Sequence, residues 1–269
     1  MEVLTRKHDL LAVSVEKKEA SLLRSNLSFY KKTGTFTAYG TQNYVEITTD
    51  KTVFLSLREK LRDIHVILEK EKSLVFLVGD RTVECFEGEI SRGELELSSP
   101  ILCVQVHRNA LLILTKNILK VYNKNLKKIQ DISLPLKFPE SFSILEVGSE
   151  SVLAVLSRSE RTCVLLSGGK VVKTLSVASG SYCVCVFPGN NGPFCAITVK
   201  NAIRVVGVFS EFDSTAESDH IGRIESVRYS EGLLYTASRE GVICTMKPGD
   251  SEACAIYVES QGISSVGLE

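Results

Sequence analysis

Tryptophan is absent from this chain of 269 residues, proline occurs only six times, and neither sign of charge is in excess. Lysine and arginine total 32, as do aspartate and glutamate, so we expect no strongly basic surface for nucleic acid. The longest apolar runs, 110–114 and 152–156, are far shorter than the roughly 20 residues that span a bilayer. The composition, with 44% hydrophobic and 24% charged residues, is that of a globular protein.

The first ten residues carry charges where a secretory signal would be apolar. Glu2, Arg6, Lys7 and Asp9 interrupt this segment, and a short alternating stretch follows it. We therefore expect a cytoplasmic or nuclear chain.

The eight cysteines give no sign of a metal site or of disulfide bonds. None shows C-x-x-C spacing, and most lie inside apolar runs, as small buried side chains do. Cys183 and Cys185 would share one face of a strand, but no third or fourth ligand accompanies them. We expect no metal ion and no other cofactor.

Catalytic motifs are also missing. The sequence contains no G-x-S-x-G, H-E-x-x-H, P-loop or G-x-G-x-x-G pattern. Acidic residues are spread over many expected loops, so a carboxylate pair could still assemble in space without a trace in the sequence. We expect a protein that is not an enzyme.

Short apolar segments of four to seven residues recur along the chain, separated by Gly, Asn, Asp, Ser or Lys, which is typical of strands joined by tight turns. Residues 101–134 contain four such strands and predict one antiparallel meander. The unit repeats at a period of about 40 residues, which is typical of a β-propeller. The other expected units cover 35–57, 64–97, 142–177, 182–209 and 224–258.

The two ends of the chain complete each other in this scheme. Residues 10–15, 20–24 and 27–30 predict three strands that lack a fourth, whereas 263–268 predicts one strand without followers. Pairing between them would remove two exposed sheet edges. The sequence therefore predicts an all-β fold, a seven-bladed WD40-like β-propeller closed by pairing of the C-terminal strand with the N-terminal strands, as a single domain over 1–269. A helix over 55–62 is a weak alternative.

One unit has the spacing of a WD repeat. It begins at Asp219-His220 and continues through residues 224–229 to residues 235–243. A typical WD repeat shares a hydrogen-bonded network among Asp, His, Ser and Trp, which cannot be complete in a chain without Trp. Met246 and Lys247 stand where Trp-Asp would be.

Residues 99–114 and 117–123 resemble the third blade of the PROPPINs, the SVP1-like phosphoinositide-binding propellers. Segments 64–68 and 73–79 resemble the blade before it, and a tolerable alignment covers about 60–247. The resemblance implies a propeller that docks on membranes carrying phosphatidylinositol 3-phosphate or 3,5-bisphosphate, in autophagy or in endosomal or vacuolar trafficking. Two basic rim pockets would bind the phosphates.

The chain departs from that family at its phosphate-binding motif. Where the family has Phe-Arg-Arg-Gly, residues 214–219 are acidic, and Ala178-Ser179 replaces an Ala-His pair. Arg204 matches an arginine that faces one pocket, although a lone strand arginine is more often a rim charge. The resemblance therefore offers these candidates for lipid contact: Arg204, Thr198, Lys200, Arg223 and Arg228.

The strongest local basic cluster lies between 116 and 128. It could contact anionic lipid, RNA or an acidic partner segment. We favour a solvated outer strand that lysines protect from edge aggregation, and the cluster lacks the series of interleaved aromatic residues that stack on bases. The basic patch consists of Lys116, Lys120, Lys124, Lys127 and Lys128.

Two functional hypotheses follow. In the first, the chain is a PROPPIN-like binding module on endosomal, vacuolar or pre-autophagosomal membranes. In the second, it is a WD-repeat scaffold subunit of a soluble cytosolic or nuclear complex, without lipid binding. Both predict protein partners and a monomer within a larger complex, and neither predicts nucleic acid.

Overall fold

A computed structural model of the chain describes residues 2–5, 10–14, 19–27, 29–33, 36–41, 43–48, 51–68, 73–258 and 263–267. All regular structure in these ranges is β-strand, which confirms the predicted all-β class. The weak helical alternative over 55–62 is wrong, because β7 ends at Ser56 and irregular backbone follows it. Within the described part of the chain, no helix could cross a membrane.

The chain divides into two compact units. Unit 1 comprises Met1–Ala12, Ala20–Leu134 and Val266–Glu269, and unit 2 comprises Val13–Glu19 and Pro135–Ser265. The single domain over residues 1–269 stays a prediction.

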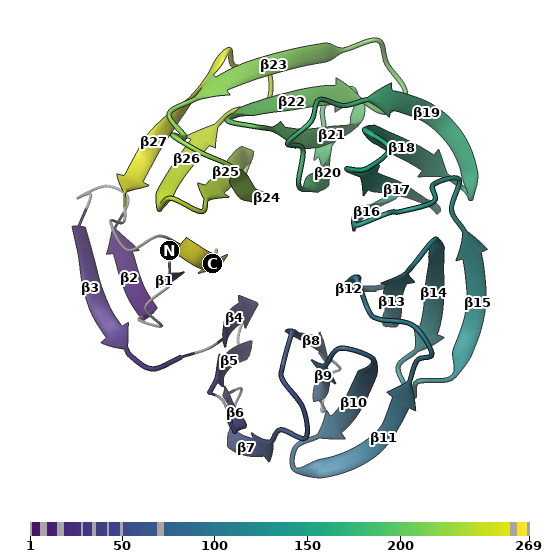
Figure 1. The fold of residues 1–269 in the computed structure, drawn as a ribbon, viewed down its shortest axis with the longest axis vertical. Helices are drawn as coiled ribbons and strands as arrows, with labels where there is room; N and C mark the ends of the chain where they lie inside the picture. The colour runs from purple at the N-terminus through teal and green to yellow at the C-terminus, as the bar shows by residue number, and fades with distance from the viewer. Residues whose placement is uncertain are drawn as a thin grey trace. The chain divides into compact units, whose positions relative to one another are not determined.

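Four sheets of four strands each belong mainly to unit 1 (Figure 1). The strand orders are β28-β1-β2-β3, β4-β5-β6-β7, β11-β10-β9-β8 and β12-β13-β14-β15. The bounds are β28 (Ile263–Gly267), β1 (Glu2–Thr5), β2 (Leu10–Ser14), β3 (Glu19–Arg24), β4 (Phe29–Thr33), β5 (Phe36–Gly40), β6 (Tyr44–Thr48), β7 (Thr52–Ser56), β8 (Asp63–Leu68), β9 (Ser73–Val78), β10 (Thr82–Glu87), β11 (Ile90–Glu96), β12 (Cys103–His107), β13 (Ala110–Thr115), β14 (Ile118–Asn123) and β15 (Lys128–Ser133).

Unit 2 contains one sheet of four strands, β16 to β19, and one of eight strands. The larger sheet consists of two antiparallel meanders, β20 to β23 and β24 to β27. Figure 1 shows β16, β20 and β24 on one side of this unit and β19, β23 and β27 on the other. The bounds are β16 (Ser141–Val147), β17 (Glu150–Ser157), β18 (Thr162–Ser167), β19 (Lys170–Ser176), β20 (Val184–Gly189), β21 (Gly192–Val199), β22 (Ala202–Gly207), β23 (Asp213–Ser218), β24 (Ile224–Ser230), β25 (Leu233–Ser238), β26 (Val242–Met246) and β27 (Glu252–Val258).

The two meanders join through their fourth strands, which run parallel. Glu217 pairs with Glu252 and Ser218 with Ala253. The Glu217 amide donates to the Ser251 carbonyl over 3.1 Å, and the Ala255 amide donates to Asp219 Oδ2 over 2.7 Å. Backbone hydrogen bonds therefore connect the two meanders on one side.

Tight turns explain why neighbouring strands pair as hairpins. Residues Arg108 and Asn109 connect β12 to β13 with φ of 47° and 58°, and Gly168 and Gly169 connect β18 to β19 with φ of 54° and 78°. Two consecutive positive φ values are the geometry of a type I′ hairpin turn, whose twist matches that of the strands. Glycine and asparagine adopt these angles at the lowest cost.

The core lies between the faces of neighbouring sheets. In unit 1, Phe76, Leu111 and Ile113 are fully buried between β8–β11 and β12–β15. Because both faces of the second strand in a sheet are covered, β13 is a continuous apolar run rather than an alternating one. Burial of one such side chain contributes about 1.5–3 kcal/mol.

The structure corrects the predicted strand assignment at the N-terminus. Residues 27–30 were expected to complete the first group, but β4 opens the next sheet. The first sheet instead contains β1, which is too short to show alternation. Consequently the C-terminal strand lies beside β1 and not beside 10–15, although it does share a sheet with the N-terminal strands as predicted.

Candidate functional site

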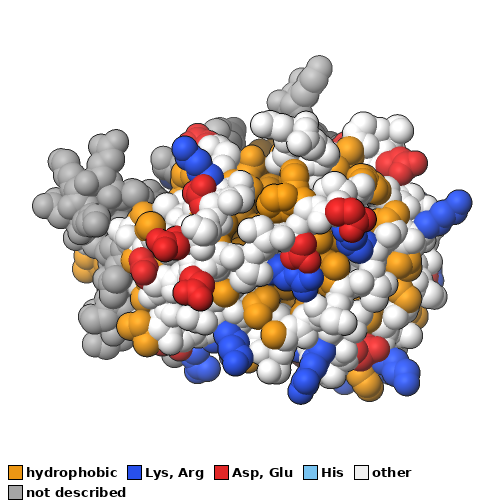
Figure 2. Space-filling view, turned by 90° about the horizontal axis from the view of Figure 1, so that it is seen from above, with side chains coloured by type: hydrophobic (Ala, Val, Ile, Leu, Met, Phe, Trp, Pro, Cys, Tyr) orange, Lys and Arg blue, Asp and Glu red, His pale blue; other side chains and the backbone are white. Residues whose placement is uncertain are grey.

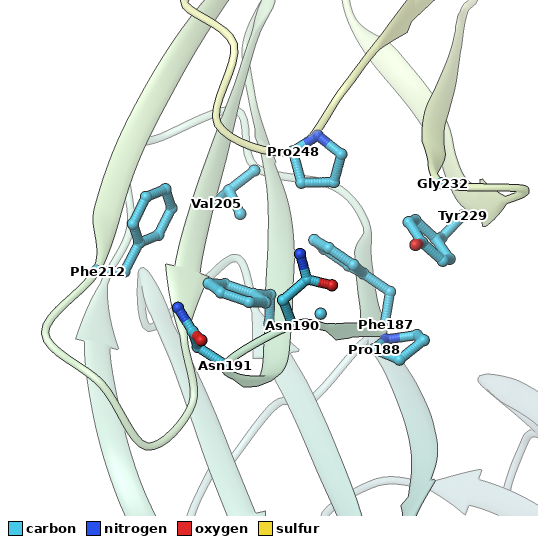
Figure 3. Close-up of a pocket in the computed structure, with 11 residues that line it drawn as sticks. Phe187, Pro188, Asn190, Asn191, Val205, Phe212, Tyr229, Gly232 and Pro248 are labelled. Atoms are coloured by element: carbon cyan, nitrogen blue, oxygen red, sulfur yellow. The ribbon is translucent and has the colours of Figure 1, made fainter.

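A cavity of about 440 Å³ lies between the two meanders of the eight-stranded sheet in unit 2 (Figure 3). The turns β20–β21, β24–β25 and β26–β27 and the β22–β23 loop contribute to its wall. Most of the lining is aromatic, proline or asparagine. The lining residues are Phe187, Pro188, Gly189, Asn190, Asn191, Phe194, Val205, Phe212, Tyr229, Gly232 and Pro248.

Aromatic rings line this cavity as an ordered row. The Phe187 ring stacks on Tyr229, with centroids 4.8 Å apart and an interplanar angle of 20°, and on Phe194 at 5.9 Å and 21°. Phe212 meets Phe194 edge-on at 5.4 Å. These offset and T-shaped arrangements are favourable for aromatic pairs, so the rings fix one another's orientation.

Local sequence explains how the β20–β21 wall forms. Pro188 lies opposite Pro193, and Gly189 opposite Gly192, on either side of the turn at Asn190 and Asn191. A Cβ atom at Gly189 would collide with the Phe194 ring, so only glycine allows the ring to lie over the strand.

The β22–β23 loop positions Phe212. The Gly207 amide donates to the Phe212 carbonyl over 2.8 Å. Lys173 Nζ on β19 donates to the carbonyls of Gly207 and Ser210 over 3.0 and 2.7 Å. A lysine from the neighbouring sheet therefore holds the loop that carries Phe212, and 39% of the Phe212 surface stays exposed.

The polar groups of the cavity are uncharged. In Figure 3, Asn190 stands between Phe212 on one side and Phe187 and Tyr229 on the other. The side-chain amides of Asn190 and Asn191 can donate and accept hydrogen bonds, and the Tyr229 hydroxyl can do both. The wall can therefore bind an uncharged ligand with apolar groups and backbone-like polar groups.

Two of the predicted lipid-contact residues, Arg204 and Thr198, lie on the paired strands β22 and β21 and are engaged by the chain itself. Arg204 Nε and Nη2 donate to the two Asp213 carboxylate oxygens over 2.8 and 2.6 Å, and Nη1 donates to the Ser176 carbonyl over 2.9 Å. The hydrogen bonds from Arg204 lower the pKa of Asp213 and keep its carboxylate ionised. The negative charge of Asp213 therefore offsets the positive charge of Arg204. Thr198 is fully buried and accepts the amides of Tyr182 and Cys183.

Lys200 and Arg223 do lie near each other. The Lys200 carbonyl accepts the amide of Ile224, which follows Arg223, over 3.3 Å, and Lys200 is exposed. The Arg223 guanidinium lies 4.0 Å from the centre of the Tyr182 ring and pairs with Glu225. Arg228 is five residues further along the chain, on β24. Their role in lipid binding stays a prediction.

The lysines of the basic patch lie on β14, β15 and the turns beside them. Lys116 has a φ of 45° at the β13–β14 turn, and Lys127 is exposed. Asp131 forms a 2.7 Å ion pair with Lys128 and lies 4.0 Å from Lys120, so it offsets part of the positive charge. Lys124 lies in the β14–β15 connection, where its carbonyl is 3.9 Å from the Cys85 thiol. Whether this patch binds a ligand also stays a prediction.

The unit with WD-like spacing retains part of the expected network. His220 Nε2 hydrogen-bonds to Thr236 Oγ1 over 2.8 Å, with 3% of the histidine exposed. Thr236 Oγ1 lies 3.5 Å from the Cys244 carbonyl, and Met246 is buried. Burial lowers the pKa of His220 to about 4, against a small opposing effect of Asp219.

Sequence reasoning missed the cavity. Its aromatic residues come from β20, β21, β24 and the β22–β23 loop, so no local spacing connects them. One signal was available: residues 187–194 place two prolines and two glycines around Asn190 and Asn191, between two phenylalanines. Within the described residues, no group of three or more His, Cys, Asp or Glu side chains could hold a metal ion.

Comparison with known proteins bears on the fold. No protein-family model matches the chain, and neither does any curated protein. The structure of BBS1N in complex with ARL6DN is similar, with a TM-score of 0.62 and 12% identity over 74% of this chain and 67% of that chain. Hsv2 from Kluyvelomyces marxianus is similar, with a TM-score of 0.60 and 11% identity over 86% of this chain and 79% of that chain.

The fold is a β-propeller. The repeated four-stranded sheets of both units agree with this similarity, and at such low identity the similarity concerns the fold alone. On the face shown in Figure 2, acidic and basic side chains are interspersed with apolar ones.

Proposed function

We propose that this propeller is a non-enzymatic binding module that docks a segment of a protein partner in the cavity lined by Phe187, Phe194, Phe212 and Tyr229. The observation that carries the proposal is the lining itself, in which aromatic rings surround uncharged hydrogen-bonding groups. The volume of about 440 Å³ is within the usual range of binding sites and suits one or two side chains with their backbone.

The chemistry of the lining favours a protein segment over an anionic head group. Phosphate groups are bound by arginine, lysine or clustered backbone amides, and none of the lining residues is Arg or Lys. A peptide offers both apolar side chains for the rings and amide groups for Asn190 and Asn191. The similar BBS1N propeller was solved in complex with ARL6DN, which is a precedent for protein binding by this fold.

The experiment is selection from a random peptide library displayed on phage, followed by affinity measurement of the enriched peptides. We expect Phe212→Ala to weaken their binding about tenfold or more, because aromatic residues at the centre of an interface contribute most of its affinity. Phe209→Ala is the matched control, since Phe209 lies in the same loop, is 58% exposed and does not line the cavity. Enriched peptides that bind Phe212→Ala unchanged would refute the proposal.

A second candidate function is phosphoinositide binding in autophagy or in endosomal or vacuolar trafficking. It is supported by the sequence resemblance to PROPPINs, by the fold similarity to Hsv2, which belongs to that family, and by the exposed Lys200 beside Arg223. The ion pair of Arg204 with Asp213 disfavours a role for Arg204.

Liposome flotation separates the two candidates. Vesicles with and without phosphatidylinositol 3-phosphate are compared for the unaltered chain, for Lys200→Ala and for Arg204→Ala. Equal flotation on both vesicles would remove the lipid function. A phosphoinositide-dependent signal that Lys200→Ala abolishes and Arg204→Ala leaves intact would support a site at Lys200.

The proposal also covers the oligomeric state and the cellular location of the protein. We propose a monomer within a larger assembly, in the cytoplasm or nucleus, with peripheral membrane attachment only under the second candidate function. Light scattering of the purified chain tests the monomeric state, and fractionation of cells expressing a tagged chain tests the location.

A further inference from the structure

We infer that the segment docked in the cavity is proline-rich, extended in the polyproline II conformation and flanked by lysine or arginine. This inference rests on the proposed function, and it specifies the partner chemistry that the same cavity takes.

The ring arrangement suits a polyproline II segment. Tyr229, Phe187 and Phe194 form a nearly parallel row, and Phe212 closes the row edge-on. A polyproline II segment has three residues per turn and a rise of about 3.1 Å, so its prolines form ridges that pack against such rings. Grooves lined by aromatic residues are the usual recognition surface for this conformation.

The polar groups of the cavity include the hydrogen-bond donors that a polyproline II ligand needs. Proline has no backbone N–H, and polyproline II carbonyls have no partner within their own chain. A matching site must therefore supply donors. The Nδ2 groups of Asn190 and Asn191 and the hydroxyl of Tyr229 are donors, and Asn190 lies between the aromatic side chains (Figure 3).

Charged residues on the connections beside the cavity favour basic residues at the two ends of the docked segment. Glu211 adjoins Phe212, Glu231 adjoins Gly232, and Asp250 lies two residues after Pro248; all three are exposed. On these three connections, the one basic residue within two positions of a lining residue is Lys247, which precedes Pro248. Lys173 Nζ also contacts the β22–β23 loop, so the connections beside the cavity carry or contact three acidic and two basic side chains. This small excess of negative charge beside an uncharged lining complements a neutral proline-rich core with basic ends.

The cavity is poorly suited to an amphipathic helix. A helix docks through an apolar stripe of residues spaced i, i+3, i+4 and i+7, which needs a continuous apolar groove. Here the Asn190 amide lies among the aromatic side chains, and an apolar helix face would leave that amide without a partner.

The experiment measures fluorescence anisotropy of a fluorescein-labelled decaproline that ends in two arginines. We expect saturable binding to the full chain, weakened about tenfold by Phe212→Ala and severalfold by Asn190→Ala, and unchanged by Phe209→Ala. A decaproline ending in two glutamates should bind several times more weakly. That difference should shrink at high salt and in the double variant Glu211→Gln, Glu231→Gln.

The controls separate this inference from the proposed function. Circular dichroism melting shows whether Phe212→Ala is folded, and Asn190→Ala, at an exposed turn, gives an independent variant. If library peptides bind through Phe212 but decaproline does not, the proline-rich inference is wrong and the proposed function stands. If no peptide binds in the cavity, both are wrong. Decaproline binding that Phe212→Ala and Asn190→Ala leave unchanged would also overturn the inference.

Discussion

His220 shows how one buried side chain couples stability to pH. Its Nε2 bonds to Thr236, while Nδ1 is buried and no partner for it is found among the described residues. A protonated imidazole at this position would bury a charge and an Nδ1–H donor for which the described residues provide no partner. The folded chain therefore holds His220 neutral, with its pKa lowered to about 4 from 6.5.

This shift predicts loss of stability in mild acid. Above pH 6.5 the side chain is neutral in both states, and between 6.5 and about 4 only the unfolded chain takes up the proton. The free energy of unfolding should fall by about 1.4 kcal/mol per pH unit in this window, or about 2 kcal/mol at pH 5. Urea denaturation at pH 7 and pH 5 measures it.

His220→Asn is the control for this pH dependence. The variant should be less stable at pH 7 by about 1 kcal/mol, for the lost hydrogen bond to Thr236, and should show a smaller drop between pH 7 and pH 5. A drop as large as that of the unaltered chain would assign the effect to other groups.

Arg204 shows why site residues were harder to predict than the fold. Its sequence match to a lipid-contacting arginine was sound as a pattern, but the residue that binds its guanidinium is Asp213, nine positions away. That contact depends on β23 pairing beside β22, and β23 was not expected as a strand. A motif specifies a side chain, whereas its partner is specified by the next strand.

At the scale of elements, the buried strands were predictable, and so were the outer strands β11, β15 and β19, but the outer strand β23 was not. The central strands, such as β13 and β17, are apolar runs that only strands at a sheet core explain. By contrast β23 has one buried residue, Ala216, so its sequence resembles a polar loop. Because residues 214–219 resemble a polar loop, they were aligned with the Phe-Arg-Arg-Gly motif and not assigned to a strand.

The hairpin turns predict a difference between two substitutions at Gly169. A Cβ atom there would meet no other atom, so the cost of substitution comes from the φ of 78° alone. Gly169→Ala should lower the free energy of unfolding by about 1 kcal/mol, and Gly169→Asn by clearly less, because asparagine tolerates this region. Urea denaturation of the two variants checks the order, and equal losses would contradict it.

At the scale of the whole molecule, repetition made the fold predictable. A period of about 40 residues and incomplete strand groups at both ends led to the shared terminal sheet, which the order β28-β1-β2-β3 contains. The cavity could not be predicted in this way, because its wall combines turns that a repeat leaves free to vary. A sequence repeat predicts how the sheets form and pack, whereas several residues of this binding cavity lie in the connections between strands, which differ from one repeat to the next.

The terminal sheet predicts a truncation phenotype. Deleting residues 263–269 would leave β1 with an unpaired edge, and unpaired edges favour association between molecules. We expect a lower melting temperature and a mass in light scattering that rises with concentration. A synthetic peptide of residues 263–269 should restore both properties, and a scrambled peptide should not. A truncated chain that melts like the full chain and stays monomeric would contradict this role of β28.

The parallel contact between β23 and β27 has a consequence for recognition. Since main-chain bonds tie the two walls of the cavity together, its width is set before any ligand arrives, and little conformational freedom is lost when one enters. A cavity of fixed width selects ligands by shape, and it excludes bulkier ligands because its walls do not move apart.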